Sequence, residues 1–307
     1  MMRLGVLDIG SVVPPRTHAD VVRDCLDLAP LADELGYSRY WLAEHHSPSI
    51  AHASPEILLP LLAGLTTHLR VGTAGVLLGF HSPYRIAATF RLLAALFPSR
   101  IDLGLARGTP DGQAAAALLD GRTAPHGVAE HARRVERLTA ALADEANLPP
   151  PLGVAPPEVW MLGSGVESAC IAAQRGLALS LALFFPRPVG PAVLERYRAE
   201  FQPSRFAAQP RTTLAVAGAC AETHAEACRM ARQYRDGFIV PTVVGTPAAC
   251  AEQLDELACR YGTDEIIFLD TATSLDDRSR TCQLLAAAVG LVPRTADRCA
   301  AGVADDR

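Results

Sequence analysis

A carboxylate and two imidazoles stand where an apolar run of the sequence stops. Tyr40-Trp41-Leu42-Ala43 leads directly into Glu44-His45-His46. An imidazole exchanges a proton near neutral pH, which makes a histidine here a candidate general acid or base. Because side chains alternate along a strand, His45 and His46 must point to opposite faces, and the pair is a poor metal site. A hydrogen-bonded structural histidine would explain either residue equally well.

Three further strand ends carry small or polar residues. Ala74-Gly75 offers small side chains that would let a flat ligand lie against the backbone. Arg107 follows an apolar strand and could face a phosphate. Gly163-Ser164-Gly165 runs into a helix, where exposed N–H groups bind anions and the hydroxyls of Ser164 and Ser168 could add donors. Tight packing, a surface salt bridge and an ordinary helix cap are the alternative interpretations of these three segments.

The elements that carry these groups alternate between strand and helix. Eight strands are expected, at Leu4–Asp8, Tyr40–His46, Leu69–Leu78, Arg100–Leu105, Val159–Leu162, Ala178–Phe185, Thr213–Ala219 and Glu265–Leu269. Eight strands separated by helices predict a closed (β/α)8 TIM barrel, whose sites lie at the C-terminal ends of the strands. An open doubly wound sheet is the alternative. It would usually need fewer strands, and no G-x-G-x-x-G turn follows the first strand.

Residues 111–157 break this regularity between the fourth and fifth strands. They contain an alanine-rich stretch, a predicted helix from Val128 to Ala143 and a proline-rich segment that must be a loop. We expect an irregular insertion here. Residues 1–292 are expected to form one barrel domain, and residues 293–307 a frayed C-terminal tail.

Composition excludes several classes of function. The chain has 307 residues, is 50% hydrophobic and carries a net charge of -5, with no basic run that would bind nucleic acid. It contains no lysine, which rules out a lysine Schiff base and a phosphate-loop lysine. The eight cysteines form no C-x-x-C pair, and no apolar run approaches the length of a membrane span. We therefore expect a cytoplasmic protein with reduced cysteines and neither a nucleic-acid nor a membrane partner.

The combined pattern resembles the bacterial luciferase-like monooxygenases, a family of flavin-dependent (β/α) barrels. The resemblance rests on Glu44-His45-His46, on Gly72–Leu78 followed by His81-Ser82-Pro83, on Arg100–Gly108 and on Leu162–Gly165. Two features near the C-terminus match as well, Gly245-Thr246-Pro247 ahead of a helix and Asp264–Ile267 in the last strand. Each piece is weak, and the set is specific.

The resemblance implies roles for the strand-end residues. His45 is the catalytic residue, and a non-proline cis peptide falls at Ala74-Gly75. Arg107 and the turn from Gly163 to Ser168 hold the flavin phosphate. The implied reaction uses reduced FMN and O₂ to oxygenate a small, apolar organic substrate, with a separate flavin reductase as partner and a homodimer as the assembly. Light emission is not implied, because Ala106 stands where luciferase has a reactive cysteine.

Three alternatives remain open at this stage. A deazaflavin on the same barrel would make the protein a hydride-transfer oxidoreductase, and a non-catalytic flavin-binding protein would use the same scaffold. A metal-dependent barrel hydrolase would need more ligands beside Glu44, His45 and His81. We expect no metal.

Overall fold

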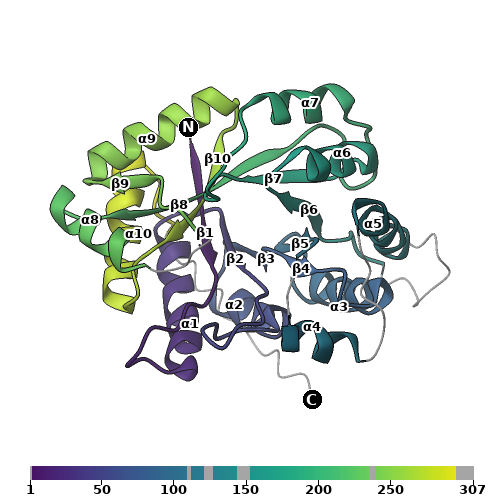
Figure 1. Ribbon diagram of the computed structural model, residues 1–307, viewed down its shortest axis with the longest axis horizontal. Coiled ribbons are helices and arrows are strands. Elements are labelled where there is room, and N and C mark those ends of the chain that lie inside the picture. Colours follow the sequence, from purple (N-terminus) through teal and green to yellow (C-terminus); the bar gives the residue numbers. More distant parts are fainter. Residues whose placement is uncertain (1, 109–111, 121–126, 144–152, 235–238, 295–307) are drawn as a thin grey trace, which may run out of the picture.

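Eight parallel strands close on themselves into a barrel (Figure 1). The computed structural model describes residues 2–108, 112–120, 127–143, 153–234 and 239–294. The barrel strands pair in the order β1 (Arg3–Asp8), β2 (Arg39–Leu42), β3 (Arg70–Thr73), β5 (Ile101–Ala106), β6 (Glu158–Gly163), β7 (Ala178–Ala182), β8 (Thr212–Cys220) and β10 (Glu265–Asp270). Pairing of β10 with both β1 and β8 closes the ring. The predicted TIM barrel is confirmed.

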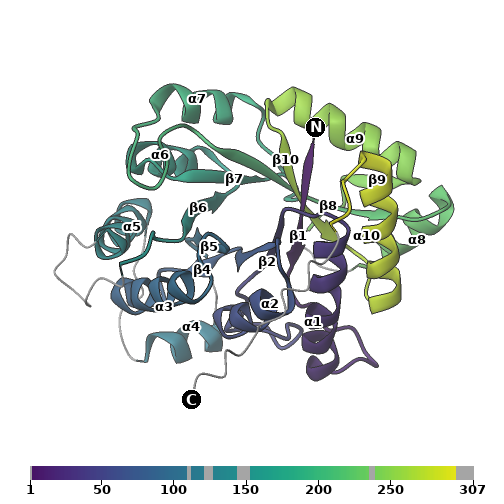
Figure 2. The ribbon, with the colours of Figure 1, turned by 180° about the vertical axis from the view of Figure 1, so that it is seen from behind.

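Helices surround the barrel, as the alternating pattern predicts. They are α1 (His18–Glu34), α2 (Leu59–Leu65), α3 (Pro83–Leu96), α5 (Val128–Leu142), α6 (Val166–Arg175), α7 (Ala192–Glu200), α8 (His224–Gln233), α9 (Pro247–Tyr261) and α10 (Leu275–Val289). Helix α10 packs against both α9 and α1, which completes the outer layer (Figure 2). Among the helices of the described residues, none combines the length and apolar character that a membrane span requires.

Side-chain alternation on the strands divides the apolar core into two layers. On β2, Tyr40 and Leu42 belong to the layer between strands and helices, whereas Trp41 and Ala43 belong to the barrel interior. Inside the barrel, the rings of Trp41 and Trp160 meet edge to face, with 5.3 Å between their centroids. The period of two along β2 therefore determines which residues face the interior.

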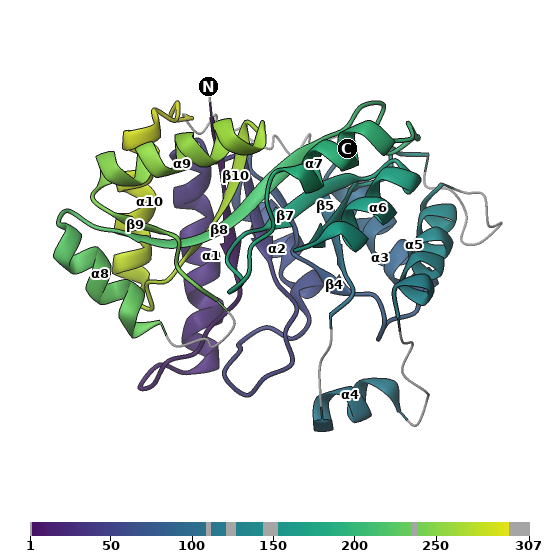
Figure 3. The ribbon, with the colours of Figure 1, turned by 45° about the horizontal axis from the view of Figure 1, so that its top comes forward.

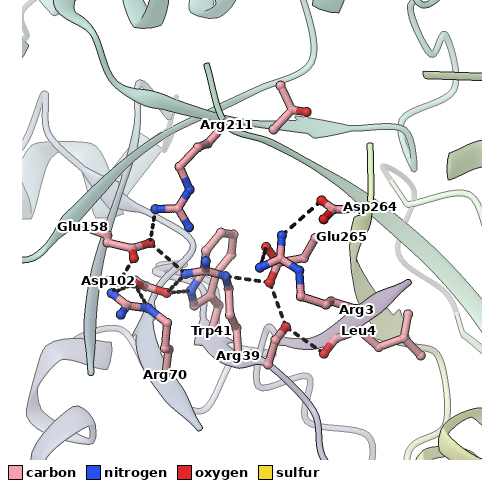
Figure 4. A network of polar contacts seen from close by, with 12 residues as sticks. Arg3, Leu4, Arg39, Trp41, Arg70, Asp102, Glu158, Arg211, Asp264 and Glu265 are labelled. Carbon is pink, nitrogen blue, oxygen red and sulfur yellow. Dashed lines mark hydrogen bonds and ion pairs between the residues drawn. The ribbon is translucent and has the colours of Figure 1, made fainter. Parts of the chain in front are cut away.

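Buried ion pairs close the N-terminal end of the barrel (Figure 4). Arg39 is 1% exposed, and its guanidinium contacts Asp102 at 2.6 Å, Glu265 at 2.8 Å and Glu158 at 3.2 Å. Burial alone would lower the pKa of Arg39, but these three carboxylates raise it above its usual value. Burial alone would raise the pKa of Glu158, but Arg39 and Arg70 hold it at about 2. We call this cluster of Arg39 and its carboxylates the barrel floor.

Some strands differ from the prediction. Strand β2 ends at Leu42 rather than at His46, because its neighbours β1 and β3 end opposite it, at Asp8 and Thr73. The third expected strand is divided into β3 and the two-residue β4 (Val76–Leu77). The sixth ends at Ala182, and the short β9 (Val243–Gly245), which pairs with the end of β8, was not predicted.

The insertion between β5 and β6 contains two helices. The alanine-rich stretch forms α4 (Gly112–Leu119), which stands apart from the barrel in Figure 3, and α5 packs against α3. Pro156 and Pro157 lie in a loop, as predicted. The prolines at 149–151 and the tail from residue 295 lie outside the described residues. Before α2, Ser54 precedes a short 3-10 turn (Pro55–Ile57) and makes no capping hydrogen bond.

We predict that Arg39→Ala lowers the free energy of unfolding by about 3–5 kcal/mol, because it leaves buried Asp102 and Glu265 without their central partner. Urea denaturation followed by circular dichroism measures the loss. Arg23→Ala is the matched control, because Arg23 pairs with Asp20 on an exposed surface and should cost no more than about 1 kcal/mol. Equal losses in the two variants would contradict the role given to Arg39.

Candidate active site

The segments expected to form the site follow strands that are adjacent in the barrel. His45 follows β2, Ala74-Gly75 follows β3, Arg107 follows β5, and Gly163-Ser164-Gly165 begins in β6. The order β2-β3-β5-β6 makes these four strands consecutive neighbours. Because neighbouring strands lie about 4.8 Å apart, their ends span an arc of roughly 14 Å at the C-terminal mouth of the barrel. The structure thus brings all four segments to one side of the mouth.

His45 and His46 have different surroundings. His46 is partly buried, and its Nε2 lies 2.7 Å from Oε1 of Glu44. His45 is exposed, two residues beyond the interior-facing Ala43. The two histidines lie beyond the end of β2 and in different surroundings, and the exposed one is the one expected to be catalytic.

Glu44 is the polar centre of the β2 end. It is 3% exposed, and its Oε1 accepts hydrogen bonds from Nε2 of both His46 and His81, each at 2.7 Å. Its Oε2 accepts from the backbone N–H of Leu77 at 2.9 Å. Burial alone would raise the pKa of Glu44, but the hydrogen bonds from His81, His46 and Leu77 hold it below its usual value. Ionised Glu44 therefore ties the end of β2 to β4 and to the loop before α3.

The Ala74-Gly75 segment is a bulge in the barrel wall. Gly72 pairs with Asp102 and Val76 pairs with Leu105, so four steps along β3–β4 oppose three along β5. The Ala74–Gly75 peptide bond is cis, as the family resemblance implies. A Cβ on Gly75 would lie 2.9 Å from the Gly104 backbone, which leaves no room for a larger residue. The bulge therefore presents backbone and small side chains to the mouth.

Arg107 lies beside the start of α6. Its Nη1 is 3.1 Å from Oε2 of Glu167 in the first turn of that helix, and both side chains are largely exposed. No side chain of the described residues caps the N-terminus of α6, and the Ser168 hydroxyl donates to the Gly165 carbonyl at 2.9 Å. A Cβ on Gly163 would lie 2.0 Å from Oγ of Ser168, so the turn needs glycine there. A cation and uncapped N–H groups thus lie together, which suits an anion.

A second buried carboxylate, absent from the sequence-based hypotheses, fixes the end of β1. Asp8 accepts hydrogen bonds from the Tyr40 hydroxyl at 2.7 Å and from Nη2 of Arg278 at 2.8 Å. Burial alone would raise the pKa of Asp8, but Arg278 and His52 hold it well below its usual value. Arg278 is 270 residues away in the sequence, so no local pattern could have indicated this contact.

The geometry gives no support to the metal-dependent hydrolase. Glu44 forms a hydrogen bond with His81, as this candidate ligand set would require, but the other histidine bonded to Glu44 is His46 rather than His45. Across the ranges that the structure describes, no three histidine, cysteine, aspartate or glutamate side chains form a group that could hold a metal ion.

Comparison with known proteins identifies the family. The family model of luciferase-like monooxygenases matches residues 2–241. The chain belongs to the luciferase-like monooxygenase family. Uncharacterized protein YwcH of Bacillus subtilis (strain 168) is 32% identical to this luciferase-like chain, over 93% of it and 98% of YwcH. A luciferase-like monooxygenase of Escherichia coli (strain K12) is 34% identical, over 76% of this chain and 71% of its own.

Solved structures agree with this assignment. The crystal structure of apo-MsnO8 superposes on this luciferase-like barrel with a TM-score of 0.88 and 34% identity, covering 96% of this chain and 100% of MsnO8. The oxygenating constituent of 3,6-diketocamphane monooxygenase, solved with FMN, has a TM-score of 0.70 and 17% identity, covering 94% and 98%. An F420-dependent secondary alcohol dehydrogenase has a TM-score of 0.64 and 11% identity, covering 94% and 99%. The last two share the fold alone.

We predict that Glu44→Gln lowers the free energy of unfolding at pH 7 by about 1–3 kcal/mol, because an amide cannot accept all three hydrogen bonds. The pKa of Glu44 is lower in the folded than in the unfolded protein, so its ionised form stabilises the fold above its ordinary pKa of 4.5. This contribution is lost as the pH falls through the folded pKa, and wild type and variant should converge in acid.

Urea denaturation over a series of pH values measures both effects. Glu136→Gln is the control, because Glu136 pairs with Arg175 at the surface and should change stability by no more than about 0.5 kcal/mol. If Glu44→Gln lowered the free energy of unfolding by the same amount at every pH, this would contradict the conclusion that Glu44 is ionised in the folded protein.

Proposed function

We propose that this protein is a monooxygenase that uses reduced FMN and O₂ to oxygenate a small organic substrate at the C-terminal mouth of the barrel. The observation that carries the proposal is the placement of Arg107 beside the uncapped start of α6, with the Ala74-Gly75 bulge and His45 on the same side of the mouth. This arrangement offers an anion site at one end and a proton-exchanging group at the other. The membership in a family of monooxygenases supports the same reaction class.

The residues near α6 suit the FMN phosphate. The Arg107–Glu167 pair is exposed, and such pairs contribute only about 0–1 kcal/mol, so a phosphate dianion can take over the guanidinium at little cost. The backbone N–H groups of Ser164, Gly165 and the first turn of α6 have no side-chain cap to displace. Phosphate would therefore bind through Arg107 and the helix N-terminus together.

The flavin ring would lie along the bulge. Ala74 is small and Gly75 has no side chain, so a planar group could approach the backbone closely. On the interior side, Ala182 and Ala217 belong to an apolar cluster, against which Phe184 and Phe185 pack. These apolar residues suit an apolar substrate and exclude water from the reacting atoms.

His45 would hold or deliver a proton beside the bound flavin. Reduced FMN supplies the electrons that activate O₂, so that one oxygen atom enters the substrate and the other leaves as water. Glu44 is a positioning residue, because its contacts fix His46, His81 and Leu77 rather than reaching into the mouth.

The proposal extends to the partners. No dinucleotide fingerprint follows the first strand, so reduced flavin would come from a separate reductase. Four leucines on α2 and α3 are exposed, and we propose that two copies of the chain pair through these two helices; the leucines are Leu61, Leu65, Leu92 and Leu96.

We predict that Arg107→Ala weakens FMN binding by about 1.5–3 kcal/mol, or roughly tenfold to a hundredfold, because it removes a charge-assisted hydrogen bond. Calorimetric titration measures the affinity. Riboflavin, which lacks the phosphate, is the matched control and should bind wild type and variant equally well. A deazaflavin titrated in the same way distinguishes the alternative cofactor. Unchanged FMN affinity, or an equal loss for riboflavin, would contradict the phosphate site.

A further inference from the structure

One cavity of the described chain lies at the opposite end of the barrel from His45 and Arg107. It measures about 420 Å³, within the range of small-molecule pockets. Its lining includes Arg3, Thr212 and Glu265, which stand at the starts of β1, β8 and β10. Because all barrel strands are parallel, this cavity opens at the N-terminal face, below the barrel floor.

The arginine side chains that line this cavity are not all paired with carboxylates. Nη2 of Arg198 donates hydrogen bonds to the carbonyls of Tyr261 and Gly262 and to the Thr212 hydroxyl. Arg198 forms no ion pair with any carboxylate of the described residues. Arg211 contacts one carboxylate, Glu158, at 3.0 Å. The positive charge of Arg198 is therefore uncompensated within the described chain.

The acids around the cavity are already committed to other arginines. Asp264 and Glu265 pair with Arg3, and Glu265 also pairs with Arg39. Glu158 is shared among three arginines, of which Arg211 is the outermost (Figure 4). The cavity itself is lined by three guanidinium groups and two carboxylates, namely those of Arg3, Arg198, Arg211, Asp264 and Glu265. The cluster lacks one negative charge.

Trp160 adds a second, independent observation. Its side chain is 1% exposed and lines the cavity, and its Nε1 has no hydrogen-bond partner among the described residues. An indole N–H can only donate, so its missing partner must be an acceptor. The guanidinium groups of Arg39 and Arg211 both lie over the Trp160 ring, at 4.7 and 5.3 Å from its centroid.

We infer that the cavity at the N-terminal face is a binding site for a small oxyanion, a phosphate or a carboxylate, held by Arg198 and Arg211. The ligand supplies the negative charge that this surface lacks. Guanidinium groups bind both anions well, so the structure assigns the shared oxyanion chemistry. This site is separate from the proposed flavin-phosphate site at Arg107 and does not depend on it.

Inorganic phosphate, titrated into the apoprotein at constant ionic strength, tests this inference. Calorimetry measures affinity, and tryptophan emission reports location, because Trp41 and Trp160 are the two tryptophans of the chain. We expect saturable binding with a change in emission. Arg198→Gln and Arg211→Gln should each weaken it by about tenfold, the scale of one charge-assisted hydrogen bond.

Two controls isolate the site. Arg107→Ala should retain the emission response, because it removes only the anion site at the mouth. Arg280→Gln should also retain it, because Arg280 pairs with Glu222 at the surface. Thermal melting verifies that each variant is folded. If Arg198→Gln does not fold, Arg211→Gln alone tests the contribution of the cavity arginines to phosphate binding.

An acetate titration distinguishes the two oxyanions, since saturation by acetate in place of phosphate assigns a carboxylate ligand. Absence of saturable binding by either anion would overturn the inference. The inference would also be overturned if chloride produced the same change in tryptophan emission, or if Arg107→Ala abolished that change. Retention of the change by both Arg198→Gln and Arg211→Gln would overturn it as well.

Discussion

The pairing of Arg39 with buried carboxylates is the interaction on which the rest of this barrel depends. A guanidinium that is 1% exposed must be neutralised, and Arg39 reaches Asp102, Glu158 and Glu265 for this purpose. These partners lie 63, 119 and 226 residues away in the sequence. The cluster therefore joins β2 to β5, β6 and β10 at their N-terminal ends, and it fixes how the opposite ends of those strands line up.

The two ends of the barrel differ in how far their polar groups are satisfied. Along the interior face of β2, Arg39 belongs to the paired floor, Trp41 to the apolar centre and Ala43 to the upper wall. Beyond that wall, His45 is exposed, and Arg107 pairs with Glu167 at the surface. The buried charges of the barrel floor are thus paired with one another, whereas groups able to bind anions or exchange protons are exposed above the tryptophan pair.

Local pattern was enough to predict the barrel and the strand ends that line its mouth, because alternation of strands and helices and the period of two along β2 are properties of neighbouring residues. Contacts that depend on closure could not be predicted in this way. Local pattern assigns no role to Glu44, because its hydrogen-bond partner His81 is 37 residues away in the sequence. Local pattern predicts that β2 extends to His46, four residues beyond its observed end, because the length of a strand depends on where its neighbours β1 and β3 end.

The central claim is that the mouth binds reduced FMN and controls its reaction with O₂. Its most direct test mixes the anaerobic complex of protein and reduced FMN with oxygenated buffer and follows flavin absorbance, for wild type and for His45→Ala. The account predicts that bound flavin reoxidises at a rate distinct from that of free reduced FMN, and that His45→Ala changes the pH dependence of this rate without changing FMN affinity. Reoxidation indistinguishable from that of free FMN in both proteins would contradict it.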